Sequence, residues 1–351
     1  MDVKSVRTVY NGQPVKNFEA SFDVIDNILS INNLTAVLPG ETDLKLRGDI
    51  NSVDGEPFYN LDAAFNSNDF LKTLNWMKLN PPVSTASTYR KAVGNAKLSG
   101  TLQKIQVSPF TLTVDKTSFS GEAGIKRGER LDAMLVLKAD MVNFDNYISA
   151  LPAEEKNKNW SQRMQYRFGQ LGFLNDFDMI IDTHFDLAIY ENMPFEKVDF
   201  KANLLNGKMD IQQLAIASAA NAKFDVSGKL SGFGKAPSYE NIKYNLKTAD
   251  VAALINKFEF KAPNLDYKQL KDFESRGIMT GNTSKMAIKA VSKLENLDFV
   301  YGGQIDFKEA ATEYNGELEL KHPDFVKMLN NFNWNYNPQT YSLGLFNLKT
   351  K

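Results

Sequence analysis

The stretch NNLTAVLPGETDLKLRGDI, residues 32–50, decides the fold. Apolar and polar residues alternate before the pair Pro39-Gly40, and they alternate again from Leu44 to Ile50. Alternation with a period of two gives a β-strand one apolar face, and a Pro-Gly pair between two such segments indicates a turn. The stretch therefore predicts two consecutive strands, with Gly48 inside the second.

The same arrangement returns three more times along the chain. Each repeat has a strand that contains a glycine, then a second strand, then a polar residue followed by a short apolar segment. The polar residues follow their glycines by 21, 22, 22 and 21 residues in the pairs Gly48 and Asp69, Gly121 and Asn143, Gly228 and Asp250, and Gly303 and Asp324. Such agreement in order and spacing predicts a repeat architecture.

The four polar residues predict the starts of short helices of about ten residues. Asp and Asn are favoured N-caps, because the side-chain oxygen accepts a hydrogen bond from a free amide of the first turn. Apolar residues follow at the first and fifth positions and share one helix face, which we expect to pack on the sheet. A cap explains both the position and the type of these residues better than a catalytic role does. The apolar pairs are Phe70 and Leu74, Phe144 and Ile148, Val251 and Ile255, and Phe325 and Leu329.

The repeated glycines indicate a bulge, a bend or a close approach in the strand, as a curved sheet needs. We therefore predict a mainly β fold: an elongated, curved antiparallel sheet of repeated β units with short capped helices, shaped like a U-shaped groove. It runs as one continuous repeat region over residues 1–351, with approximate units 17–80, 90–152, 177–260 and 277–334. Both ends look truncated, so we expect the chain to be a fragment of a longer protein.

Residues 153–176 are a helical insertion between the second and third units. Apolar residues recur there every three or four positions, which is typical of a helix with one apolar side. We favour a helix packed against the edge of the sheet, and a helix lying on a membrane surface is the alternative. The apolar residues are Trp160, Met164, Phe168, Leu171 and Leu174.

Composition excludes several classes of function. The net charge is -1, with 41 basic and 42 acidic residues, so we expect no nucleic-acid partner. There is no cysteine, no long apolar run and no signal for phosphate, cofactor or zinc binding. We expect no enzyme, no cofactor and no resident metal. Asp182, His184 and Asp186 alternate along one strand; we interpret them as a solvated polar face, with a metal site as the alternative.

Three segments carry a resemblance to a known family. They are LTAVLPGETDLKLRGDI, then LDAMLVLKADMVNFDNYISALP, then FEKVDFKANLLNGKMDIQQLAIASAANAKFDVSGKLSGFG followed by YNLKTADVAALINKF. In order and spacing they resemble the AsmA family (AsmA-like and TamB-like proteins, of the alphaproteobacterial type), over roughly residues 17–330. The chain would be a fragment of the periplasmic repeat region of such a protein.

The resemblance implies a body in the periplasm and an inner-membrane anchor that this chain lacks. It also implies phospholipid or another acyl lipid as the partner, carried along an apolar β-groove in support of outer-membrane biogenesis, with envelope proteins as further partners. The family has no catalytic motif to carry over.

For such a groove the candidate lining residues are the alternating apolar ones. They are Phe22, Val24, Leu44, Leu46, Phe119, Met179, Ile181, Phe185, Leu187, Phe224 and Val226. The alternative for each is a dry core packed against the helices. At the level of function, the alternatives are a non-catalytic periplasmic scaffold or spacer and, less favoured, a hydrolase that uses carboxylates.

Overall fold

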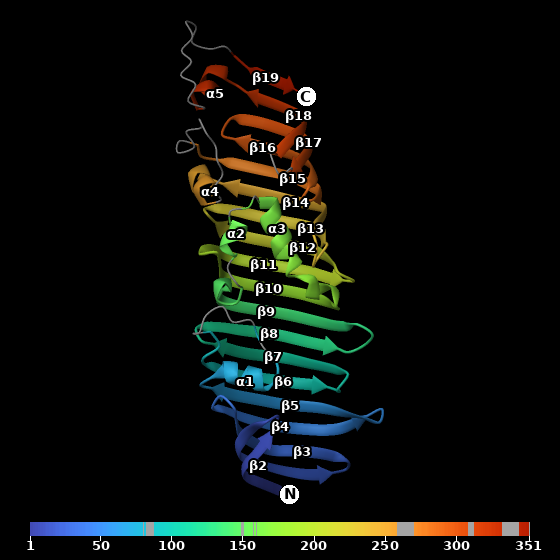
Figure 1. Ribbon diagram of the computed structural model, residues 1–351. Coiled ribbons are helices and arrows are strands. Elements are labelled where there is room, and N and C mark those ends of the chain that lie inside the picture. The colour runs from blue at the N-terminus through green and yellow to red at the C-terminus, as the bar shows by residue number, and fades with distance from the viewer. Residues whose placement is uncertain are drawn as a thin grey trace. The chain divides into compact units, whose positions relative to one another are not determined.

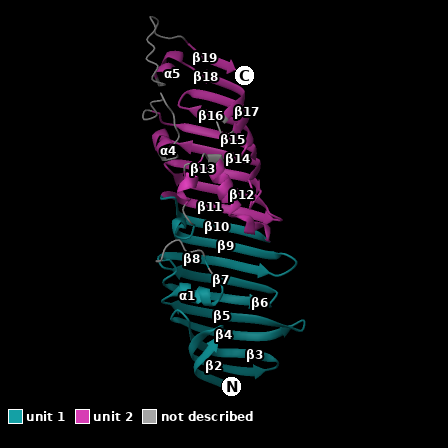
Figure 2. Cartoon of the chain, viewed as in Figure 1, with its two compact units in different colours: residues 1–150, 177–192 teal, residues 151–176, 193–351 magenta. Residues whose placement is uncertain are grey.

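The computed structural model describes residues 1–79, 81, 88–148, 151–156, 158, 160–257, 270–307, 312–331 and 344–350. It confirms the predicted mainly β fold with few short helices: 67% of the chain is strand and 12% is helical, and the strands do not close on themselves (Figure 1). Two compact units result, residues 1–150 with 177–192 and residues 151–176 with 193–351 (Figure 2).

Unit 1 consists of ten strands in which each pairs with the next along the chain. All of these pairs are antiparallel except the last, between β9 and β10. The strands are β1 (Asp2–Tyr10), β2 (Gln13–Ile25), β3 (Ile28–Leu38), β4 (Thr42–Val53), β5 (Glu56–Ser67), β6 (Ala92–Gly100), β7 (Lys104–Val114), β8 (Thr117–Lys126), β9 (Leu131–Asn143) and β10 (Phe177–Tyr190).

The parallel pair of β9 and β10 corrects the prediction of a purely antiparallel sheet. Leu131 lies opposite Phe177 and Ala139 lies opposite Phe185, so both strands run in the same direction. Parallel neighbours need a long connection that returns the chain to the starting end. The helical insertion supplies that connection.

Unit 2 contains nine strands, each antiparallel to the next. They are β11 (Met193–Leu205), β12 (Lys208–Ala219), β13 (Ala222–Ser231), β14 (Ser238–Thr248), β15 (Phe273–Asn282), β16 (Lys285–Leu294), β17 (Leu297–Phe307), β18 (Thr312–His322) and β19 (Phe346–Thr350). The insertion in this unit forms three short helices: α2 (Ala153–Lys156), α3 (Trp160–Gly169) and η2 (Gly172–Asn175).

A short helix follows the second strand of each repeat. The helices are α1 (Phe70–Trp76) after β5, η1 (Phe144–Asn146) after β9, α4 (Val251–Lys257) after β14 and α5 (Phe325–Asn331) after β18. Each begins directly after its predicted cap. The side-chain oxygens of Asp69, Asn143, Asp250 and Asp324 accept hydrogen bonds from the amides of Lys72 (3.4 Å), Asp145 (3.0 Å), Ala253 (2.9 Å) and Lys327 (3.1 Å).

The helices are shorter than the ten residues that we expected. Three have seven residues, and η1 is a single three-residue turn of 3-10 helix. The turn is tighter than an α-helix, because the Asn143 side chain accepts from the amide only two residues ahead and the Tyr147 amide donates to the Phe144 carbonyl three residues before it. Ile148 is therefore exposed instead of facing the sheet as predicted.

Three of the four repeated glycines, Gly48, Gly121 and Gly228, pair with a residue at a bulge of the neighbouring strand, whereas Gly303 lies in a ladder without a bulge. Gly48 pairs with Ile31, where the register of β3 shifts by a bulge before Leu34. Its φ is +138°, and a Cβ there would lie against the carbonyl oxygen of Asn60. Gly121 has the same relation to a bulge in β7, where it pairs with Phe110. Bulges and glycines of this kind bend and twist a sheet.

We predict that Gly303→Ala lowers the free energy of unfolding by roughly 2 kcal/mol, because the new Cβ would meet the carbonyl oxygen of Asn315. At the neighbouring Gly302 an added Cβ would have no atom within 4 Å. We therefore expect Gly302→Ala to change the free energy of unfolding by less than about 0.5 kcal/mol. Urea unfolding of the two variants measures the difference. Equal losses would contradict the proposed close approach.

A second prediction concerns pH. The hydrogen bonds that the Asp250 carboxylate accepts from the Ala253 amide and the Asn221 side chain lower its pKa. A lowered folded-state pKa means that the stabilisation is present above the unfolded value of about 3.9 and is lost as the pH falls through the folded value. We expect Asp250→Asn to lower the melting temperature at pH 7, and this effect to diminish progressively as the pH falls below about 4. Asp54→Asn, at a residue that accepts no hydrogen bond from the described residues, is the control.

Candidate functional site

In unit 1 the strand register places apolar side chains on one side of the sheet. Residues directly opposite each other in neighbouring strands share a face, so each chain of pairs is a row across the sheet. One row contains Ala36, Leu44, Phe65, Gly94, Leu112, Phe119, Ala139 and Phe185. A second row, on the same side of the sheet, contains Ile31, Gly48, Leu61, Leu98, Val107, Ala123, Leu135 and Ile181. We call the side that bears these rows the apolar face of unit 1.

The opposite side carries the charges and is called the polar face. Arg47 lies opposite Asp62 on it, with 3.4 Å between Nε and Oδ2, and Lys97 lies 3.8 Å from the same carboxylate. His184 and Asp186 of β10 also lie there, 3.3 Å apart. The parts of the chain that the structure describes contain no group of three metal-ligating side chains close enough to hold an ion.

The structure places nine of the predicted lining residues together on the apolar face of unit 1. All nine are half-buried except Val24, which is 72% exposed. They are Phe22, Val24, Leu44, Leu46, Phe119, Met179, Ile181, Phe185 and Leu187. The other two, Phe224 and Val226, lie in unit 2.

Unit 2 has an apolar face of the same construction. Phe224 pairs with Ile216 and Leu246, and Val226 pairs with Leu214 and Tyr244. The row through Val226 contains Phe200, Leu214, Val226, Tyr244, Gly277, Ala290, Tyr301 and Leu318. At its far end α5 covers this face, because Met328 and Leu329 are buried against Leu297 and the rings of Phe325 and Phe346 stack 4.7 Å apart.

In unit 1 helix α1 covers only one margin of the apolar face. Its Thr73 hydroxyl lies 2.6 Å from that of Thr42 and donates to the carbonyl of Pro39 at 2.8 Å. Thr42 in turn donates to Ser67 at 2.5 Å, and all three hydroxyl residues are buried. Phe70 stacks on Phe65 with 5.4 Å between ring centroids. This buried hydroxyl cluster fixes the helix over the ends of β4 and β5.

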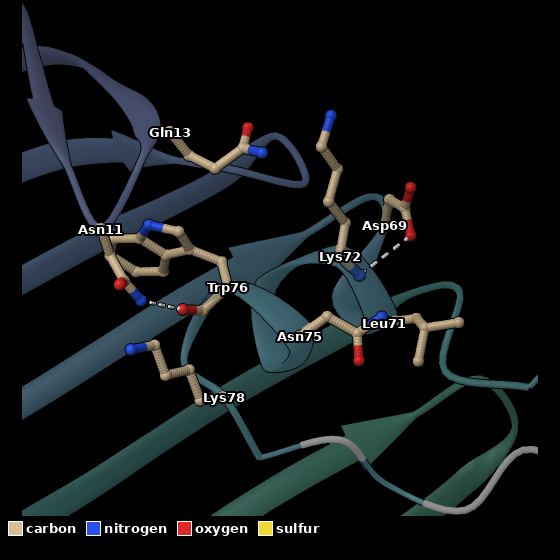
Figure 3. A pocket seen from close by; sticks show the side chains of 8 residues that line it. All are labelled: Asn11, Gln13, Asp69, Leu71, Lys72, Asn75, Trp76 and Lys78. Atoms are coloured by element: carbon tan, nitrogen blue, oxygen red, sulfur yellow. Dashed lines mark hydrogen bonds between the residues drawn. The ribbon is translucent and has the colours of Figure 1, made fainter.

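The tip of the β1–β2 hairpin forms hydrogen bonds with the last residue of α1. The Asn11 amide donates to the carbonyl of Trp76 at 2.6 Å, and the Trp76 indole donates to the carbonyl of Tyr10 at 3.0 Å. Between the hairpin and the helix lies a pocket of about 510 Å³, with Gln13, Lys72 and Trp76 around it (Figure 3). Val15 and Ala20 of β2 and Ile31 and Ala36 of β3 are buried.

Sequence reasoning missed the contact between hairpin and helix. The Asn11-Gly12 pair is a hairpin signal, and both residues have positive φ. A turn signal does not say what the tip of the hairpin touches, however. Trp76, the last residue of α1, is 65 residues away from Asn11 in the sequence.

Strands β7 and β8 are buried at one end and exposed at the other. In β7, Val114 is 4% exposed and Ile105 is 37% exposed; in β8, Thr117 is 7% exposed and Ile125 is 45% exposed. Ile105 and Ile125 pair directly, so they lie side by side on the apolar face. Within the described residues, the apolar face of unit 1 is therefore covered at one margin and exposed at the other.

The helical insertion packs against unit 2. Phe168 of α3 is buried and stacks on Phe233 of the β13–β14 loop, with ring centroids 5.5 Å apart. The Gly234 amide donates to the Phe168 carbonyl, and Asn175 donates to the carbonyl of Phe233, both at 2.8 Å. Of the apolar residues of the insertion, Phe168 thus serves packing, as favoured from the sequence, but on a loop instead of a strand edge.

Shifted acidities in these units reflect structural contacts. The backbone amide of Ser118 lowers the pKa of Asp140, and the Lys321 ammonium lowers the pKa of Glu319. Burial raises the pKa of Tyr239 on the apolar face of unit 2 to about 12. A general acid at neutral pH needs a raised carboxyl pKa, and these two carboxyl groups are shifted the other way.

Comparison with protein-family models, with curated proteins and with solved structures found no match for this chain. Among the helices of the described residues, none has both the length and the apolar character that crossing a membrane requires.

We predict that Thr73→Val lowers the free energy of unfolding by about 1–3 kcal/mol, because the buried Pro39 carbonyl and the Thr42 hydroxyl lose their partner. Thr73→Ser keeps the hydroxyl and loses only a methyl group, so it costs clearly less. Urea unfolding followed by tryptophan fluorescence tests both variants. A larger loss for the serine variant would show that the methyl group, and not the hydroxyl cluster, holds α1.

Proposed function

We propose that this chain binds phospholipid or another acyl lipid on its apolar face. The observation that carries the proposal is the exposed margin of that face in unit 1, where Ile105 and Ile125 lie side by side in water. Exposed apolar surface of this kind is unfavourable in water, and contiguous patches of it mark binding sites.

An extended acyl chain fits the geometry of the rows. Neighbouring strands lie about 4.8 Å apart, so a row across five strands is roughly 20 Å long. Each methylene that the face removes from water contributes about 0.8 kcal/mol. The rows carry no charged side chain, so a bound chain would meet only apolar side chains, glycines and, in unit 2, the rings of Tyr244 and Tyr301.

The resemblance to the AsmA family gives the proposal its setting. The chain would be part of the periplasmic body of an envelope protein held to the inner membrane by an anchor outside this sequence. There it would pass lipid along the sheet in support of outer-membrane biogenesis, with envelope proteins as partners at its ends.

A non-catalytic scaffold or spacer for envelope assembly is the second candidate. It is favoured by the covered end of unit 1, where the β1–β2 hairpin is hydrogen-bonded to α1 and Val15, Ala20 and Ala36 are already buried. A sheet whose apolar face is filled by its own chain has no need of lipid.

Two adjacent residues of β10 separate these functions. Met179 lies on the apolar face, whereas Ile180 lies on the polar face and is 54% exposed. The chain, purified from a bacterial host, is extracted with organic solvent and its lipid is quantified by mass spectrometry. We expect bound phospholipid that falls several-fold in Met179→Asp and stays unchanged in Ile180→Asp.

Circular dichroism of both variants checks that the strands remain folded. A folded wild-type chain that carries no lipid, under conditions where a known lipid carrier retains it, would favour the scaffold. Equal loss in both variants would show that lipid binds without regard to the apolar face.

A further inference from the structure

The polar face of unit 2 contains three apolar side chains that break its pattern. Val291 and Val300 pair directly across β16 and β17 and are 47% and 43% exposed, and Ile278 lies beside them on β15. Their chain neighbours Gly277, Ala290 and Tyr301 belong to the apolar face, so these three project on the charged side. Exposed apolar groups gathered on a charged surface indicate a site of interaction.

These three side chains lie in an open hollow of about 830 Å³. Cationic groups surround them: Lys243 lies opposite Ile278, Arg276 lies opposite Val291, and Lys289 lies opposite Ile278 on its other side. Lys349, Glu317 and Glu319 complete the charged lining. Glu319 is already engaged, because it accepts a hydrogen bond from Lys321 at 2.8 Å.

The cations of the hollow differ from their neighbours on the same face. Lys247 lies 3.7 Å from Glu274, and Lys285 lies 3.9 Å from Asp306, so both have a carboxylate partner. By contrast, Lys243, Arg276 and Lys289 form no ion pair with any residue that the structure describes. Three unpaired cations around an apolar floor are complementary to an anionic group attached to an apolar body.

We propose that this hollow binds an anionic amphiphile: an alkyl chain that lies on Ile278, Val291 and Val300 and a phosphate group held by Arg276 with Lys243 and Lys289. The planar guanidinium of Arg276 can hold two phosphate oxygens at once, which a lysine cannot do. The site lies on the face opposite the apolar face, so it does not rest on the proposed lipid function.

Octyl phosphate below its micelle concentration is the probe, titrated into the full chain by calorimetry. Octanol and inorganic phosphate each present one half of its chemistry, and we expect both to bind much more weakly. Charge-assisted hydrogen bonds and buried methyl groups are each worth enough to change affinity about tenfold. We therefore expect roughly tenfold weaker binding in Arg276→Gln and in Val300→Asn, with a smaller loss in Arg276→Lys.

Lys247→Gln is the matched control, because it removes a cation of the same face that already has a partner. Inorganic phosphate that binds as well as octyl phosphate would overturn the proposal, and so would binding that Arg276→Gln leaves unchanged. Met179→Asp distinguishes the two proposals. If octyl phosphate binding is lost in Met179→Asp and kept in Arg276→Gln, the ligand binds on the apolar face, and the proposed site in the hollow is wrong. Binding to anionic vesicles without binding to the monomeric probe would also overturn it.

Discussion

The pairing register of the strands is the constraint on which the rest of the structure depends. Side chains alternate between faces with a period of two, so a slip of one residue would move Leu46 to the side of Lys45 and Arg47. Bulges opposite Gly48 and Gly121 allow the strands to twist while the residues on both sides of each bulge keep their faces. Both candidate binding surfaces exist only in this register.

The helices set how much of the apolar surface meets water. In unit 1 the hydroxyl cluster of Thr42, Ser67 and Thr73 holds α1 over one margin, and the β1–β2 hairpin closes against the same helix. Seven residues of helix do not reach the ends of β7 and β8 at Ile105 and Ile125, which stay exposed. In unit 2, α5 covers its end of the sheet more completely.

Local signals explain what could be predicted from the sequence. Alternation placed Leu44, Leu46 and Phe119 on one face correctly, and Asp69 and Asp250 marked helix starts, because each signal acts within a few residues. The contact of Asn11 with Trp76 and the parallel pair of β9 and β10 depend on how distant segments meet. For the hollow of unit 2 the sequence contains one signal, because Val291 and Val300 occupy positions of their strands where polar residues are expected. That its cations have no ion-pair partner can be seen only in the three-dimensional structure.

The spacing of the helices within each unit has a geometric consequence. In unit 1 four strands separate the end of β5 from the end of β9, and in unit 2 four strands separate the end of β14 from that of β18. In an antiparallel sheet an even number of strands restores the direction of the chain. The helices α1 and η1 therefore follow strand ends on the same side of their sheet, and α4 and α5 do so in theirs (Figure 1). With three or five strands per repeat, successive helices would follow opposite ends of the strands. They would then cover the apolar surface from both sets of strand ends. An even number of strands per repeat thus lets such a sheet lengthen by whole repeats while the apolar surface stays accessible at the strand ends that carry no helix.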